Sequence, residues 1–225
     1  MSNSILIRLM CVHFNYLVYP YHLILMEGGS VCVFANSLTN IAICEHPKGS
    51  WHHSIGIHLP KSNAVALFPE EVLSLYLEGK IIFSDMGTSM ELLKRIYAGV
   101  NETIIGTHFT QNLFALYQHL RSCSLITKRQ SAVNHIADAL NKAGYPLTLK
   151  KVKEENTEEE IIYLAYKTKE ELKAGKVCFK VLIEDEEKVT FEELERLSKL
   201  NIKLAVVRES KVVMLNFEPM KLCSA

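Results

Sequence analysis

The chain begins with an apolar segment, and short apolar runs separated by turn-forming residues follow it through the first third of the sequence. Runs rich in Val, Ile and Cys predict strands, because such side chains suit a buried or half-buried sheet. The predicted strands cover residues 30–34, 40–44, 55–59 and 81–83, with a turn at 46–49.

A helix is predicted between Pro69 and Gly79. Proline suits the first turn of a helix, and Glu70 and Glu71 lie where the positive end of the helix dipole favours acids. Gly79 favours the backbone conformation that ends many helices.

Three further groups of apolar residues recur at helical spacing and predict three more helices. Thr88 or Ser89 is suited to cap the first of them, and a short strand at 125–126 precedes the last. The groups are Met90, Leu93 and Tyr97; Phe109, Leu113, Leu116, Tyr117 and Leu120; and Ala132, Val133, Ile136, Ala137 and Leu140.

Charged residues dominate between 150 and 160, which indicates a linker or a solvated loop. Strands at 161–166 and 177–183 follow, and Thr190 is suited to cap a helix. The turn at 208–211 separates two last runs, 203–207 and 212–217, as in a hairpin. The order of these elements is β-β-α-β-β.

The pattern therefore predicts an α+β or α/β protein with two units. The first is a small mixed N-terminal unit of short strands and helices, and the second is the β-β-α-β-β unit. All nine histidines lie at or before His135, and this change of composition also favours two units. We place the N-terminal domain at 27–130, a helix and charged linker at 131–157, and the C-terminal domain at 158–225.

Residues 1–26 form an apolar extension that fits no common targeting signal. Arg8, His13, Pro20 and His22 interrupt it, whereas a membrane-spanning helix needs about 20 apolar residues with few charges. A signal peptide would end in small residues before a cleavage site. We leave this segment out of the fold prediction, and a membrane anchor remains an alternative.

Charge and cysteine content narrow the classes of function. The 225 residues include 25 basic and 25 acidic side chains, so a strongly basic nucleic-acid-binding tail is excluded but a local basic patch is not. The six cysteines are scattered, without the close pairs of a zinc site or the density of a disulfide framework. We therefore expect no cofactor and no metal ion.

Four segments in the same order resemble the tRNA-splicing endonuclease family. The segment 67–81 resembles the family's "L-x-P-E-E-A-L-Y-L-x-E-x-G-x-L" pattern, and 49–59 resembles the small strands before it. The segment 116–129 resembles a "Y-x-x-L-K-R-x-G-Y-x-V-x-R" helix and strand, although Cys123 and Ser124 replace the usual glycine and aromatic residue. The segment 191–217 resembles the end of the nuclease-like domain. The whole match covers roughly residues 30–221, with a gap around 131–157.

The resemblance implies a non-catalytic structural subunit of a nuclear hetero-oligomer with two catalytic and two structural subunits. Its expected partners are the catalytic and accessory subunits and precursor tRNA, with no DNA and no membrane. The complex would be a metal-independent tRNA-intron endonuclease, and this chain would help to position the intron-containing precursor.

The catalytic subunits of the family use a Tyr, a His and a Lys to cleave RNA. Such cleavage needs a base, an acid and a cation that stabilises the transition state. This chain has no histidine after His135, and the corresponding region reads Lys173 to Lys176. Tyr163 and Tyr166 lie in the equivalent strand and Lys199 or Lys203 near the usual lysine, but without the histidine we expect a degenerate nuclease-like domain with no catalytic residue.

Two sets of residues are candidates for binding. Cations that flank the predicted helices are candidates for phosphate contacts, although cations near helix ends are usually only solvated. This RNA-binding set is Lys94, Arg95, Arg121, Lys128 and Arg129.

The last strand is either an edge open to a partner strand or an internal strand. The family's docking loop before it is acidic, but here 208–211 holds a single acid. The candidate subunit-interface residues are Glu209, Val212, Met214 and Phe217.

Other interpretations remain open. His52 and His53 beside Trp51 suggest stacking on a base or, less readily, a metal site. Residues 107–145 suit a winged-helix-like nucleic-acid-binding adaptor. A further alternative is a divergent catalytic endonuclease subunit in which another residue acts as the acid.

Overall fold

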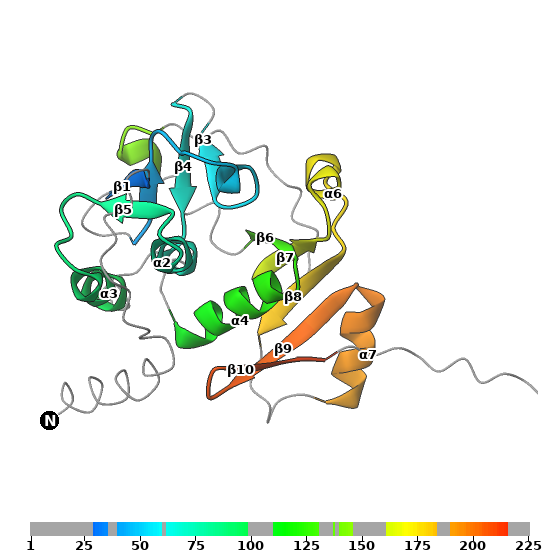
Figure 1. The fold of residues 1–225 in the computed structure, drawn as a ribbon. Helices are drawn as coiled ribbons and strands as arrows, with labels where there is room; N and C mark the ends of the chain where they lie inside the picture. The colour runs from blue at the N-terminus through cyan, green and yellow to red at the C-terminus, as the bar shows by residue number, and fades with distance from the viewer. Residues whose placement is uncertain are drawn as a thin grey trace, which may run out of the picture.

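The computed structural model describes residues 29–35, 40–59, 62–98, 110–130, 137, 140–145, 161–183 and 190–215. The protein is a mixed α+β fold, as the sequence predicts, and its described strands form two five-stranded mixed sheets (Figure 1). The extension 1–26, most of the linker 131–157 and Phe217 lie outside the described residues.

The first sheet has the strand order β3-β4-β2-β1-β5. All neighbours are antiparallel except β1 and β5, which pair in parallel with Ser30 opposite Ile81. The strands are β1 (Ser30–Phe34), β2 (Ala42–Cys44), β3 (Ile57–Leu59), β4 (Ala64–Leu67) and β5 (Ile81–Phe83). A short 3-10 helix, η1 (Trp51–His53), precedes β3.

Side chains of the first sheet enter two separate clusters because they alternate between its faces. One face, with Ala42 and Cys44 of β2, packs against α2 (Pro69–Leu77) and α3 (Ser89–Ala98). The other face, with Ile41 and Ile43, packs against Ala137 and Leu140 from the third predicted helical group.

The second sheet has the strand order β10-β9-β8-β7-β6. Only β8 and β9 pair in parallel; the other neighbours are antiparallel. The strands are β6 (Ile126–Arg129), β7 (Tyr163–Tyr166), β8 (Phe179–Ile183), β9 (Ile202–Arg208) and β10 (Lys211–Leu215).

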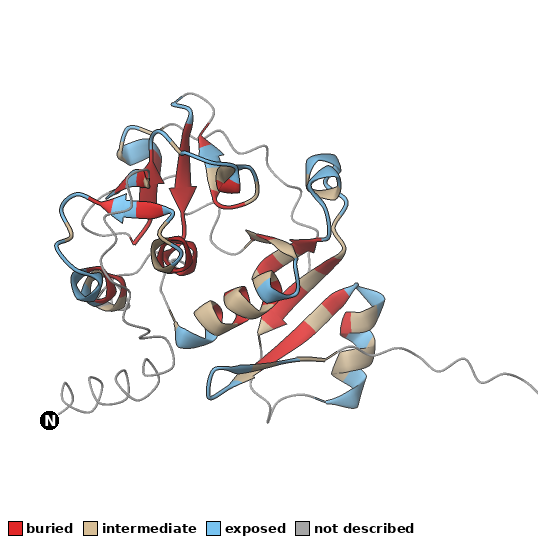
Figure 2. Cartoon of the chain, in the orientation of Figure 1, coloured by how far each residue is buried: buried red, intermediate tan, exposed pale blue. Residues whose placement is uncertain are grey.

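Helices cover both faces of the second sheet. α4 (Gln111–Ser122) buries Leu113, Leu116, Tyr117 and Leu120 against one face, and α7 (Phe191–Lys199) buries Leu197 against the other. The short α6 (Lys169–Ala174) has no buried residue and stands out from the sheet (Figures 1 and 2). Thr190 caps α7 as predicted, since its side chain accepts a hydrogen bond from the amide of Glu193.

The structure groups residues 111–129 differently from the sequence prediction. α4 and β6 belong to the layers of the second sheet, whereas the pattern assigned them to the N-terminal unit. Ala137 and Leu140 pack instead on the first sheet, so the described parts of 107–145 do not form one winged-helix module. The strand β4 and the helix α6 were not predicted.

In the described parts of the chain, no helix has the length and apolar character needed to cross a membrane.

Candidate functional site

The start of α2 is one of the places where the two sheets are joined. Glu70 is fully buried, and its Oε1 accepts hydrogen bonds from Arg129 Nη1 of β6 and from the Tyr163 hydroxyl of β7, both at 2.7 Å. The Arg129 side chain is only 2% exposed. A buried ion pair needs such close geometry to offset the loss of hydration, so these contacts hold α2 against the second sheet.

The neighbouring Glu71 binds the first sheet. Its Oε1 accepts from the Gly56 amide at 3.0 Å and its Oε2 from the Phe68 amide at 2.9 Å. Burial, and then the charge of Glu70, raise the pKa of Glu71 to about 7 from its ordinary value of 4.5. Lys128 Nζ donates to the Gly56 carbonyl at 2.8 Å, and burial lowers the pKa of Lys128.

We call these six residues the junction network: Gly56, Glu70, Glu71, Lys128, Arg129 and Tyr163. Burial opposes the charge of Arg129, but Glu70 and Tyr163 outweigh this effect and raise its pKa. Burial and the charge of Glu70 also raise the pKa of the Tyr163 hydroxyl well above its ordinary value. At the centre of the network, the Arg129 guanidinium and the neutral Tyr163 phenol therefore both donate hydrogen bonds to the same oxygen of Glu70.

The junction network corrects part of the predicted RNA-binding set. Arg129 is buried and paired with Glu70, so it offers no surface to a phosphate. Lys128 is partly buried and its ammonium is bound to a backbone carbonyl of the other sheet. The paired acids of α2 were expected to interact with the helix dipole, and the structure also buries both of them: Glu70 pairs with Arg129, 59 positions along the chain, and Glu71 accepts from the backbone amides of Gly56 and Phe68.

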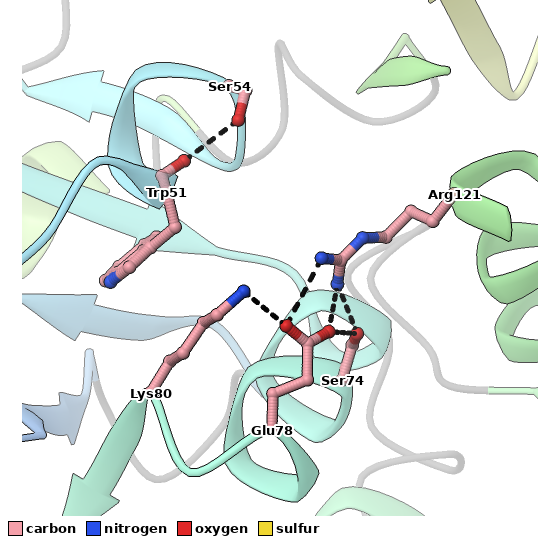
Figure 3. A network of polar contacts seen from close by, with 6 residues as sticks. All are labelled: Trp51, Ser54, Ser74, Glu78, Lys80 and Arg121. Atoms are coloured by element: carbon pink, nitrogen blue, oxygen red, sulfur yellow. Dashed lines mark hydrogen bonds and ion pairs between the residues drawn. The ribbon is translucent and has the colours of Figure 1, made fainter. Parts of the chain in front are cut away.

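A second polar network lies at the end of α2 (Figure 3). Arg121 of α4 and Lys80 approach the Glu78 carboxylate from opposite sides, each with a contact of 2.5 Å. Arg121 also donates to the Ser74 hydroxyl at 2.6 Å. Partial burial of Glu78 opposes its charge, but Lys80 and Arg121 outweigh this effect and lower its pKa. Arg121 therefore lies beside a second cation, Lys80, which the sequence prediction did not select.

The two remaining members of the predicted RNA-binding set lie on α3. Lys94 is exposed and pairs with Glu91 at 2.9 Å. The Arg95 guanidinium lies 4.3 Å from the centre of the Phe34 ring. The structure therefore does not gather the five predicted cations into one surface.

The side chains considered for a catalytic triad have other contacts. Tyr163 is buried and bound to Glu70, and Lys203 Nζ lies over the Phe179 ring at 4.4 Å from its centre. Lys199 pairs with Glu195 at 2.9 Å on the exposed face of α7. Burial raises the pKa of Tyr166.

The last strand of the described chain, β10, is an edge. Among the described strands it pairs with β9 alone. Val213 is 55% exposed, whereas Val212 and Met214 pack toward the core beneath α4. Glu209 and Ser210 form the two-residue turn before it and both have positive φ, which a non-glycine residue rarely adopts. The turn exposes Glu209 at its tip. Of the two possibilities left open by the sequence, the described strands favour the edge.

The histidines around η1 form a small cluster. The ring centres of His52 and His53 lie 4.0 Å apart, and His58 lies 6.0 Å from His52. Burial lowers the pKa of both His52 and His58. Within the described ranges, no group of three or more His, Cys, Asp or Glu side chains is placed to hold a metal ion.

Comparison with known proteins assigns no family to this chain. No family profile matches the sequence, and no curated protein matches it significantly.

Proposed function

We propose that this protein is a non-catalytic structural subunit of a tRNA-splicing endonuclease, as the sequence resemblance implies. The observation that carries the proposal is that β10 is an edge strand of the second sheet. The side chains of this half that were considered for a catalytic triad make structural contacts instead. The complex would be nuclear and would contain catalytic subunits, with this chain helping to hold intron-containing precursor tRNA.

The edge strand supports an assembly role. An unpaired strand edge presents backbone donors and acceptors that a partner strand can complete. β10 combines such an edge with the exposed apolar side chain of Val213. The strained turn at Glu209 and Ser210 holds the single acid of this loop at the surface, where a partner can reach it.

The contacts of Tyr163 and Lys203 support a non-catalytic role. A tyrosine that acts on RNA must reach the substrate, whereas Tyr163 is 1% exposed and donates to a buried carboxylate. No histidine follows His135 to act as the acid or base near neutral pH.

Affinity purification of the tagged full chain from cells tests the proposal. We expect mass spectrometry to identify endonuclease subunits and the eluate to cleave precursor tRNA. Val213→Lys should reduce recovery of the partners, because a lysine at an edge disfavours strand addition. Met90→Lys is a matched control, since Met90 is 53% exposed but lies on α3.

Recovery of no endonuclease subunit would overturn the proposal. Cleavage of precursor tRNA by the purified chain alone would contradict the non-catalytic assignment and favour a divergent catalytic subunit. A stable monomer that binds duplex DNA would favour the adaptor alternative.

A further inference from the structure

We infer that an open groove beside α2 and α4 binds the phosphate backbone of RNA. This inference rests on the proposed function and locates an RNA contact in it. The groove has a volume of about 510 Å³, which is within the usual range of ligand sites. Its cationic lining residues are Lys48, Lys80, Arg121 and Lys169.

The four cations come from separate parts of the fold. Lys48 follows β2, Lys80 precedes β5, Arg121 is near the end of α4, and Lys169 begins α6. The groove therefore draws on elements of both sheets. A run of phosphodiesters would offer these cations several negative charges at once.

The charge balance of the groove favours an anion. No acidic side chain occurs among the described residues that line it. The nearby Glu78 binds Lys80 and Arg121 and so holds both cations at one side (Figure 3). Lys48 and Lys169 are exposed, and neither has an ion-pair partner among the described residues. Glu78 neutralises part of the charge of Lys80 and Arg121, whereas Lys48 and Lys169 keep theirs, and such an excess of positive charge raises the local concentration of anions.

The remaining lining residues permit close approach of a backbone. Three glycines, Gly29, Gly49 and Gly79, and two serines, Ser50 and Ser54, form much of the surface. Glycine removes the side chain that would keep a phosphate from the protein backbone, and serine offers a hydroxyl donor. Trp51 and Ile55 supply the apolar part of the wall.

RNA fits this groove better than a single small anion does. Lys80 and Arg121 are held together by Glu78 and can bind one phosphate, whereas Lys48 and Lys169 are available to further phosphates of the same strand. Each phosphate that is neutralised along a single strand releases counterions, so the salt dependence of binding reports the number of contacts. This property allows the groove to be tested without knowledge of the RNA sequence.

The test measures binding of the full chain to fluorescein-labelled precursor tRNA and to labelled oligo(U), as a function of salt. We expect Lys48→Gln with Lys169→Gln to weaken binding roughly tenfold, and to reduce the slope of log affinity against log salt by about 1.4, from two lost contacts of about 0.7 each. Lys142→Gln with Lys199→Gln is the matched control, because it removes two exposed lysines that do not line the groove.

Equal binding by the groove and control variants would overturn the inference, with retained circular dichroism showing that both are folded. Full displacement of oligo(U) by an equal concentration of inorganic phosphate would also overturn it, since the site would then hold one small anion. If endonuclease subunits copurify while the groove variant binds RNA normally, the groove fails and the proposed function stands. If the groove variant loses RNA binding but no endonuclease subunit copurifies, the groove stands and the proposed function fails.

Discussion

Replacement of Arg129 by methionine should separate the two halves of the junction network. Methionine keeps much of the apolar stem of arginine but removes its charge and its donors. Glu70 would then be a fully buried carboxylate whose remaining donor among the described residues is the Tyr163 hydroxyl, and its Oε2 has no hydrogen-bond partner among them even in the intact protein. The variant therefore isolates the cost of an uncompensated buried charge.

The expected loss is large because both side chains are excluded from water. The exposed fractions are 2% for Arg129 and 0% for Glu70, so solvent cannot replace the missing cation. Removing one partner of a buried pair typically lowers the free energy of unfolding by about 3–5 kcal/mol. For the exposed pair of Lys94 and Glu91, the same substitution at Lys94 should cost at most about 1 kcal/mol.

Urea unfolding followed by tryptophan fluorescence and by far-ultraviolet circular dichroism measures these losses. Trp51 is the single tryptophan and lies in the cluster between the first sheet and α2, so its emission reports that part, while circular dichroism reports all elements. The double variant Arg129→Met with Glu70→Gln should recover part of the loss, because it removes the unpaired charge as well. An Arg129→Met cost no greater than that of Lys94→Met, or a double variant that costs as much as both single variants combined, would refute the reasoning.

Three further predictions concern other parts of the same structure. Because folding raises the pKa of Glu71 to about 7, protonation of Glu71 stabilises the folded state. This contribution to the free energy of unfolding is complete below about pH 4.5 and is lost as the pH rises through 7. Between about pH 5 and 8, urea titrations should therefore show wild-type stability falling relative to Glu71→Gln, and parallel curves would contradict the assignment. Gly56→Ala should lower the melting temperature by several degrees, because its φ is +71° and a Cβ would lie 2.5 Å from Val65 Cγ1; an unchanged melting temperature would contradict the placement. Glu209→Asn with Ser210→Gly should raise the melting temperature by about 1–3 °C, since both positions have positive φ, and calorimetry showing no increase would contradict a strained turn.

Local patterns predict most of the described elements because their causes lie within a few residues. Pro69 and Gly79 bound the segment that contains α2, and Thr190 caps α7, because capping depends on nearby backbone groups. The strand β4 was missed because Ala64 to Leu67 is buried on both faces and so lacks the alternation that marks a half-buried strand. α6 was missed because it is one short polar helix with no buried residue.

The grouping of elements was harder to predict, because it depends on contacts between distant residues. The apolar face of α4 indicates that the helix is partly buried, but it does not determine which sheet the helix packs against. The signal that could have found the junction network is the match of two adjacent acids, Glu70 and Glu71, with two adjacent cations, Lys128 and Arg129. Each pair has a sufficient local explanation, a helix dipole for the acids and solvation for the cations, and the sequence alone offers no reason to reject either.

The geometry of α2 connects the junction network to the proposed RNA groove. Glu70 and Glu71 at its start bind the two sheets, and Glu78 at its end binds Arg121 and Lys80. One rigid helix therefore sets both the position of α4 and the distance between cations contributed by different sheets. If the junction is weakened, the cations that line the groove should change their relative positions, although none of these side chains is removed. Arg129→Met, which removes no lining residue, should then weaken RNA binding at urea concentrations that leave wild-type binding intact, whereas Lys199→Met, at an exposed ion pair on α7, should not.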